Sequence, residues 1–277
     1  QVCDRAAFMK DGRILKVYHK EEMVDEKVWP FVISYEDTHP LREEERQKGT
    51  IQFQKITTEY LHQVSFSLNR GECVVLFDRN KKLQTDIIDF ICGNVDMFSG
   101  SVLFGDEVIN YRLSKGQRER DIAIIGENAT KTMLFYDMNY IDNLCFLLDK
   151  KVQKISAKRI KKSIQKEYYQ ELGDEVYEED LNNLDKKSLY NLVYYRVQLL
   201  NPKVVFIIQP FSNADMYLRR HIVHLIRILK RKGIAVIIVA VSISDSLFVA
   251  DRLLLFEEGS IQREYGTDEF EQLRIQI

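Results

Sequence analysis

The chain contains little glycine, few cysteines and no long apolar run. Glycine accounts for 12 of 277 residues, about 4%, which leaves little material for a glycine-rich loop that cradles phosphate. The four cysteines lie far apart and without the spacing of metal ligands, so we expect reduced, mostly buried thiols. The longest purely apolar run, Ile234–Val241, has eight residues, far short of the ~20 that a membrane span needs.

An excess of one charge is also missing. The 40 Lys and Arg nearly balance the 42 Asp and Glu, for a net charge of −2, so no global basic field indicates a nucleic-acid partner. Locally, eight basic residues lie within 150–166 and seven acidic residues within 167–180. We interpret this block as a solvated helix face. The five histidines do not cluster in sequence, and they predict neither a catalytic triad nor a metal site.

A short internal repeat relates the two ends of the chain. Cys3–Tyr18 reads CDRAAFMKDGRILKVY, and Ala250–Tyr265 reads ADRLLLFEEGSIQREY. The identical pairs are Asp4/Asp251, Arg5/Arg252, Gly12/Gly259, Ile14/Ile261 and Tyr18/Tyr265. Each copy has the pattern of a strand, a turn at glycine and a second strand. The second copy closes a domain, so we expect the first to be the closing hairpin of a preceding domain.

The domain organisation predicted from this repeat has three parts. Residues 1–18 are the closing hairpin, residues 19–48 a charged linker, and residues 49–277 a domain of their own, with a helical subdomain at about 127–200. A short helix over Met23–Val32, anchored by Trp29, is predicted within the linker.

From residue 49 onward, strand patterns alternate with helix patterns. Half-buried strands are predicted over Ile51–Ile56 and Val64–Leu68, and a hairpin over Gly100–Phe104 and Glu107–Asn110. Continuous apolar runs predict buried strands over Cys73–Phe77, Ile122–Ile125, Val204–Ile208 and Ile234–Val241. Helices are predicted over Thr85–Cys92, Ser156–Leu172, Ser188–Leu200 and Leu218–Lys232. This order indicates an α/β domain with a parallel core sheet and antiparallel additions.

Four segments carry a resemblance to a known family: LHQVSFSLNRGE (61–72), DIAIIGEN (121–128), LNPKVVFIIQP (200–210) and VADRLLLFEEGSI (249–261). In order and spacing they resemble the second nucleotide-binding domain of tandem ABC-transporter ATPases, the ribose/galactose-type sugar importers. The resemblance covers essentially the whole chain. It implies the P-loop NTPase fold of an ABC ATPase, with a mostly parallel core sheet, an antiparallel β subdomain and a helical subdomain.

The phosphate loop departs from the family pattern G-x-x-x-x-G-K-[ST]. Here residues 78–85 read DRNKKLQT. Asp78 and Leu83 stand at the two glycine positions, Gln84 stands at the lysine position, and only Thr85 is retained. A carboxylate at Asp78 lies where a polyanion should bind, and Leu83 does not easily adopt the positive φ of glycine. Lys81 and Lys82 remain as point charges.

The other catalytic elements are altered as well. The Walker B acidic pair is replaced by Ile208, which cannot ligate Mg²⁺, and Gln209, which cannot accept a proton as a carboxylate does. The signature loop, residues 184–189, reads LDKKSL and places Asp185, Lys186, Lys187 and Ser188 at its central positions. Ser242 stands at the switch-histidine position. Glu127 at the Q-loop position and Asp215 at the D-loop position follow the family.

Together these changes predict a degenerate, non-hydrolytic ABC ATP-binding domain that acts as a structural or regulatory half of a tandem sugar-importer-type ATPase. No cofactor and no metal are expected, whereas the family would use ATP and Mg²⁺. Residual ATP binding, and with it enzymatic activity, stays open. One alternative is a functional ATP-binding half that couples to a permease. Another is a cytosolic sensor or interaction protein that uses the vestigial cleft.

The resemblance also implies partners. In the family, the segment after the Q-loop borders a groove that receives a short permease helix, and here Met133, Phe135, Tyr136 and Met138 would line it. The expected partners are a preceding ABC half in the same chain and membrane permease subunits, without nucleic acid. The expected location is cytoplasmic, peripheral at the inner face of the cell membrane.

Overall fold

The structure, a computed structural model, describes residues 5–10, 13–19, 51–92, 99–105, 107–109, 121–148, 154–243, 245–271 and 273. The chain divides into two units, Gln1–His39 and Pro40–Ile277, which are described separately. The helix expected over Met23–Val32, like most of the 19–48 linker, lies outside the described residues.

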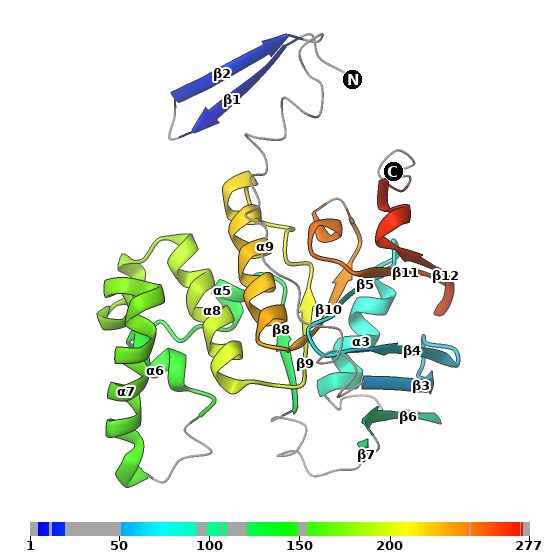
Figure 1. The fold of residues 1–277 in the computed structure, drawn as a ribbon, viewed down its shortest axis with the longest axis horizontal. Coiled ribbons are helices and arrows are strands. Elements are labelled where there is room, and N and C mark those ends of the chain that lie inside the picture. Colours follow the sequence, from blue (N-terminus) through cyan, green and yellow to red (C-terminus); the bar gives the residue numbers. More distant parts are fainter. Residues whose placement is uncertain are drawn as a thin grey trace. The chain divides into compact units, whose positions relative to one another are not determined.

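The second unit is built on a six-stranded sheet with the order β12-β11-β5-β10-β9-β8 (Figure 1). Its strands are β5 (Cys73–Phe77), β8 (Ile122–Ile125), β9 (Val204–Ile208), β10 (Ala235–Ala240), β11 (Arg252–Glu257) and β12 (Ser260–Gly266). All neighbouring pairs are parallel except β11 and β12. Every residue of β5, β9 and β10 is buried, which explains why the sequence shows continuous apolar runs there.

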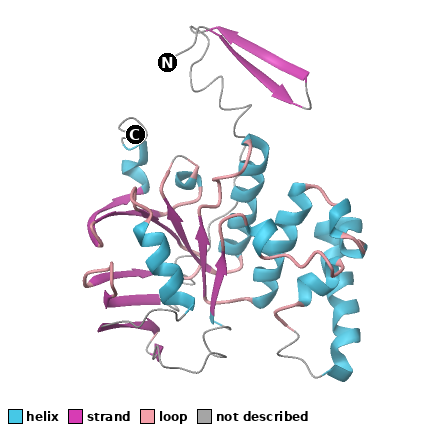
Figure 2. Cartoon of the chain, turned by 180° about the vertical axis from the view of Figure 1, so that it is seen from behind, coloured by secondary structure: helices cyan, strands magenta, loops and turns pink. Residues whose placement is uncertain are grey.

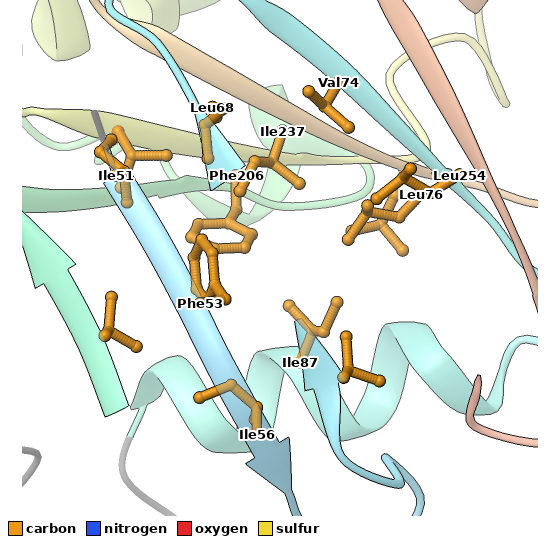
Figure 3. Close-up of a cluster of buried hydrophobic side chains, with 14 of the residues drawn as sticks. Ile51, Phe53, Ile56, Leu68, Val74, Leu76, Ile87, Phe206, Ile237 and Leu254 are labelled. Carbon is orange, nitrogen blue, oxygen red and sulfur yellow. The ribbon is translucent and has the colours of Figure 1, made fainter. Parts of the chain in front are cut away.

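A smaller antiparallel sheet has the order β4-β3-β6-β7. Its strands are β3 (Ile51–Thr57), β4 (Val64–Leu68), β6 (Ser99–Phe104) and β7 (Glu107–Ile109). This sheet, helix α3 (Lys82–Cys92) and one face of the large sheet enclose a single apolar core (Figure 3). Phe53 stacks on Phe66 with ring centres 4.5 Å apart and meets Phe206 edge-on at 6.3 Å. Leu83 and Ile208 belong to the same core.

Five further described helices lie on the other side of β8, β9 and β10 from α3 (Figures 1 and 2). They are α5 (Ala129–Thr132), α6 (Tyr140–Cys145), α7 (Lys154–Leu172), α8 (Lys186–Leu200) and α9 (Met216–Arg231). The described residues also form short 3₁₀ turns at η2 (Gly173–Tyr177), η3 (Leu181–Asn183), η4 (Ser246–Phe248) and η5 (Thr267–Glu269). Within the described part of the chain, no helix combines the length and apolar character needed to cross a membrane.

The predicted strands match closely, but the predicted helices begin too late. In the structure α3 begins at Lys82 rather than at Thr85. Helices α7, α8 and α9 each begin two residues before the predicted start. For α8 and α9 the reason is an aspartate cap: Asp185 accepts a hydrogen bond from the Ser188 N–H at 2.7 Å, and Asp215 accepts one from the Leu218 N–H at 2.9 Å. A cap lengthens a helix toward its N-terminus beyond the apolar pattern.

The first unit contains one described hairpin, formed by β1 (Arg5–Lys10) and β2 (Arg13–His19). Its register matches that of β11 and β12. Arg5 pairs with His19 as Arg252 pairs with Gly266. Both hairpins carry a register shift at the equivalent place, between Phe8 and Met9 and between Leu255 and Phe256. The sequence repeat is therefore also a repeat of strand pairing.

Candidate functional site

The loop between β5 and α3 is organised around Asp78, whose side chain is only 2% exposed. Its Oδ1 accepts a hydrogen bond from the Asn80 N–H at 3.0 Å, and its Oδ2 accepts one from the Leu83 N–H at 3.0 Å. The Tyr60 hydroxyl donates to the same Oδ2 at 3.4 Å. The carboxylate thus collects backbone donors of the kind that bind phosphate at the start of a helix.

Tyr60 reaches this loop from the connection between β3 and β4. Gly259, in the turn between β11 and β12, has φ +76° and lies so close to the Tyr60 carbonyl that any side chain there would collide with it. Burial raises the pKa of the Tyr60 hydroxyl, and the negative charge of Asp78 raises it further. The hydroxyl therefore stays protonated and can donate to the carboxylate. Nothing in the local sequence singles out Tyr60, and the motif comparison missed it.

The tight turn of the loop lies at Lys81, which has φ +59°. Leu83, at the second glycine position of the family motif, is instead the second residue of α3, and its side chain is fully buried in the core. A left-handed lysine costs about 1 kcal/mol relative to glycine. The loop therefore turns two residues earlier than the glycine pattern predicts, and it places an apolar anchor where the family has no side chain.

Two further predicted positions come together as a neutral pair. Gln84 lies on α3, and Gln209 follows the last residue of β9 with only 8% exposure. The Gln209 Nε2 donates to the Gln84 Oε1 at 3.2 Å, and the Val241 N–H reaches the Gln209 Oε1 at 3.5 Å. Ser242, next in sequence to Val241, is exposed, as is Thr85. The family pattern expects a cation and a carboxylate at these two positions, whereas here two neutral amide side chains form a hydrogen bond with each other.

The ATP and Mg²⁺ implied by the resemblance do not fit this set of donors. Asp78 already takes the backbone donors of the loop and would repel a polyphosphate. The Ile208 side chain is fully buried in the apolar core and offers no oxygen ligand. Among the described residues, no group of three or more His, Cys, Asp or Glu side chains could hold a metal ion. Hard cations such as Mg²⁺ need oxygen ligands.

The signature segment lies at the start of α8 and is tied to η2. The Asp185 Oδ1 accepts from the Ser188 N–H, and this hydrogen bond lowers the pKa of Asp185. The Ser188 hydroxyl donates to the Glu175 Oε1 at 2.6 Å, so this serine is used internally. Lys186 and Lys187 are exposed. The segment offers two cations and a capped helix start in place of glycine N–H groups and a free serine.

The Q-loop and D-loop positions lie on segments that are linked through their neighbours. The Asn213 Nδ2 donates to the Asn128 Oδ1 at 2.6 Å, which joins the segment after β8 to the segment after β9. Glu127 is half-buried. Asp215 serves as the N-cap of α9.

Two of the four residues expected to line a partner groove are exposed aromatic side chains. Phe135 is 37% exposed and Tyr136 is 39% exposed, and the Phe135 ring lies 4.3 Å from the ring of Phe146, which is also exposed. Met133 and Met138 are half-buried. We call Phe135, Tyr136 and Phe146 the aromatic surface.

Two buried polar residues hold the backbone under the aromatic surface, and the motif comparison missed both. The Asn143 Nδ2 donates to the carbonyls of Phe135 and Met138 at 2.8 and 3.0 Å. The Arg196 Nη1 donates to the Met133 carbonyl at 2.5 Å, and its Nη2 donates to the Asn143 Oδ1 at 2.9 Å. Burial lowers the pKa of Arg196 to about 10. An arginine within the apolar stretch of α8 was the only signal in the sequence.

A surface hollow of about 450 Å³ adjoins the phosphate-loop position. Its lining combines the loop with the β11–β12 hairpin: Asp78, Arg79, Asn80, Leu255, Phe256, Glu257, Glu258 and Gln262. Acidic side chains outnumber the single arginine, so the hollow does not favour a polyanion.

Comparison with known proteins finds similar proteins that align over nearly the whole chain. No family model matches. The ribose import ATP-binding protein RbsA of Clostridium tetani is 22% identical over 284 residues, which covers 99% of this chain and 56% of the relative. The RbsA of Geobacillus kaustophilus is also 22% identical, over 280 residues and 98% of this chain. The chain thus spans little more than half the length of these curated relatives.

Solved structures show the same fold. Clostridium perfringens cbiO1, part of the ABC transporter complex cbiONQ, superposes with a TM-score of 0.67 at 16% identity, over 81% of this chain and 91% of that one. The ADP conformation of MJ1267, an ATP-binding cassette of an ABC transporter, superposes with a TM-score of 0.64 at 20% identity, over 81% of this chain and 94% of that one. The predicted fold class, an ABC ATPase fold with its antiparallel and helical additions, is confirmed.

Proposed function

We propose that this chain is a non-hydrolytic nucleotide-binding-type domain that serves as a structural or regulatory half of a tandem sugar-importer ATPase. Relatives named as ribose import ATP-binding proteins align over nearly its whole length. The observation that carries the non-hydrolytic part is the neutral Gln84–Gln209 contact beside a fully buried Ile208.

The chemistry of phosphoryl transfer supports the non-hydrolytic part of the proposal. Phosphoryl transfer depends on positioning and on charge stabilisation by Mg²⁺ and cationic groups, together with a residue that orients the attacking water. Gln84 carries no charge for phosphate, Ile208 has no metal ligand, and Gln209 is no carboxylate. The altered signature segment weakens this domain as a contributor to a site on another domain too.

We further propose that residues 1–18 close a preceding domain of the same fold, with residues 19–48 as the linker and about 127–200 as the helical subdomain. The shared register of the two hairpins supports this assignment. So does exposure: Ile261 packs against the core of its domain, whereas its counterpart Ile14 is 59% exposed. In the second unit β11 pairs in parallel with β5. A preceding domain would supply the corresponding neighbouring strand for β1.

The retained task in this proposal is docking on a membrane permease, which would hold the domain at the inner face of the membrane. Aromatic side chains and methionine are enriched at interface cores. The aromatic surface is aromatic throughout, and the buried side chains of Asn143 and Arg196 hold the backbone at Phe135 and at nearby Met133 by hydrogen bonds.

Calorimetric titration with MgATP, paired with a phosphate-release assay, tests the proposal. The Clostridium tetani relative, prepared in the same way, is the positive control. We expect no tight, Mg²⁺-dependent isotherm and no hydrolysis above background for this chain. A tight isotherm with hydrolysis would favour the second candidate, a functional ATP-binding half of a sugar importer, which the whole-chain alignment with ATP-binding proteins supports.

A further inference from the structure

Asp78 differs from two other aspartate caps of the chain in its burial. Asp185 caps α8 through backbone N–H groups that include that of Ser188, Asp215 caps α9 through the Leu218 N–H, and both aspartates are exposed. Asp78 receives two backbone N–H groups and the Tyr60 hydroxyl, and it is 2% exposed. A buried carboxylate needs donors of this kind to offset its desolvation.

The three donors come from separate parts of the site. The Asn80 N–H belongs to the loop, the Leu83 N–H belongs to the first turn of α3, and the Tyr60 hydroxyl comes from the connection between β3 and β4. Backbone N–H groups at such a loop and helix start form an anion-binding concavity. Lys81 and Lys82 add positive charge along the same loop. The concavity is therefore present, and the chain's own carboxylate fills it.

We propose that Asp78 is a built-in anion: its carboxylate takes the donors that a phosphate group would take, and so keeps the loop and α3 ordered without a ligand. A tethered carboxylate competes at an effective concentration of millimolar or more, on the order expected for short linkers. Phosphate groups are thereby excluded from the loop of the natural protein. The inference deepens the proposed loss of nucleotide chemistry and rests on it for the identity of the site, but its geometry can be tested separately.

The test measures how inorganic phosphate changes the thermal midpoint of three proteins: the natural chain, Asp78→Ala and Asp215→Ala. The Asp78→Ala variant frees the concavity, so its midpoint should fall without phosphate and rise by about 3–6 °C when phosphate reaches ten times its Kd. The Asp215→Ala variant also uncaps a helix, but it leaves Asp78 in place. It should lose stability and respond to phosphate no more than the natural chain does.

The outcomes decide the proposal. Equal phosphate responses in all three proteins would overturn it, because general salt stabilisation acts on every variant alike. An equal response in Asp215→Ala and Asp78→Ala would also overturn it, because any uncapped helix would then bind phosphate. Should Asp78→Ala fail to fold, Asp78→Ser keeps a cap of smaller size, leaves room for the anion and is expected to show the same phosphate-dependent rise.

This test is independent of the hydrolysis assay. Hydrolysis of MgATP by the natural chain would contradict the proposed non-hydrolytic function, whatever the variants show. Absence of hydrolysis, together with no phosphate-dependent rise of the thermal midpoint in either Asp78 variant, would agree with the non-hydrolytic function but overturn the proposal that Asp78 is a built-in anion.

Discussion

Substituting Gln84 by Lys and Gln209 by Glu restores the two charges of the family motif. The variants test whether these two side chains are in contact and whether the two charges suffice for ATP hydrolysis. The Gln209→Glu variant keeps an acceptor for the Val241 N–H but loses the donor that reaches the Gln84 Oε1 at 3.2 Å. It also places a negative charge at a side chain that is only 8% exposed. Leaving a polar group of a part-buried site without its hydrogen-bond partner costs about 1–3 kcal/mol, and we expect a loss of stability in this range.

The Gln84→Lys variant should be milder by itself. Residue 84 is half-exposed, so a lysine can extend its charged end toward water along the protein surface. We expect a change of about 0–1 kcal/mol. In the double variant the ammonium and carboxylate groups face each other across the same short gap. A coupling energy of about 1–3 kcal/mol should then recover much of the loss seen in Gln209→Glu.

Urea unfolding of the natural chain, both single variants and the double variant gives this coupling directly. An MgATP assay on the same four proteins should show no hydrolysis, because Asp78 still takes the loop donors and Ile208 still provides no metal ligand. Purely additive stability changes would show that the two side chains are not in contact. ATPase activity regained by Gln84→Lys alone would show that the rest of the site is intact.

Three further results are expected. Replacing Phe135 by Ala should reduce recovery of membrane partners in a pull-down and leave the fold intact. The control Tyr169→Ala, at an exposed aromatic on α7, should leave that recovery unchanged. Equal recovery by both variants would favour the cytosolic sensor. Deleting residues 1–18 should shift the thermal midpoint by only a few degrees, on a scale of ~2–4 °C per kcal/mol, and failure of the shortened chain to fold would make the hairpin integral. Burial, with smaller contributions from Lys187 and His224, lowers the pKa of His221 to about 4. Because the unfolded chain binds that proton near pH 6.5, stability should fall by up to about 3 kcal/mol between pH 6.5 and 4. The fall should shrink in His221→Gln, measured by urea unfolding at each pH, and an identical pH profile in both proteins would contradict the assignment.

The strands were predictable because their signal is local. The run CVVLF fixes β5, since a strand covered on both faces needs apolar side chains at every position. The starts of α3 and α8 and the roles of Asp78 and Arg196 were not predictable in this way. Each depends on a side chain that meets a backbone group or a residue far along the chain, such as Arg196 with the Met133 carbonyl. Residue type alone does not reveal these partners.

The same packing would make the proposed loss of nucleotide chemistry difficult to reverse. Ile208 and Leu83 are fully buried and belong to the apolar core. Returning Leu83 to glycine would remove a buried leucine side chain, at about 2–5 kcal/mol or more, and returning Ile208 to aspartate would place a carboxylate against apolar neighbours at several kcal/mol. A domain of this kind has about 5–15 kcal/mol of stability in total. Reversion one residue at a time would therefore weaken the fold before any chemistry returned, whereas the aromatic surface needs none of these positions.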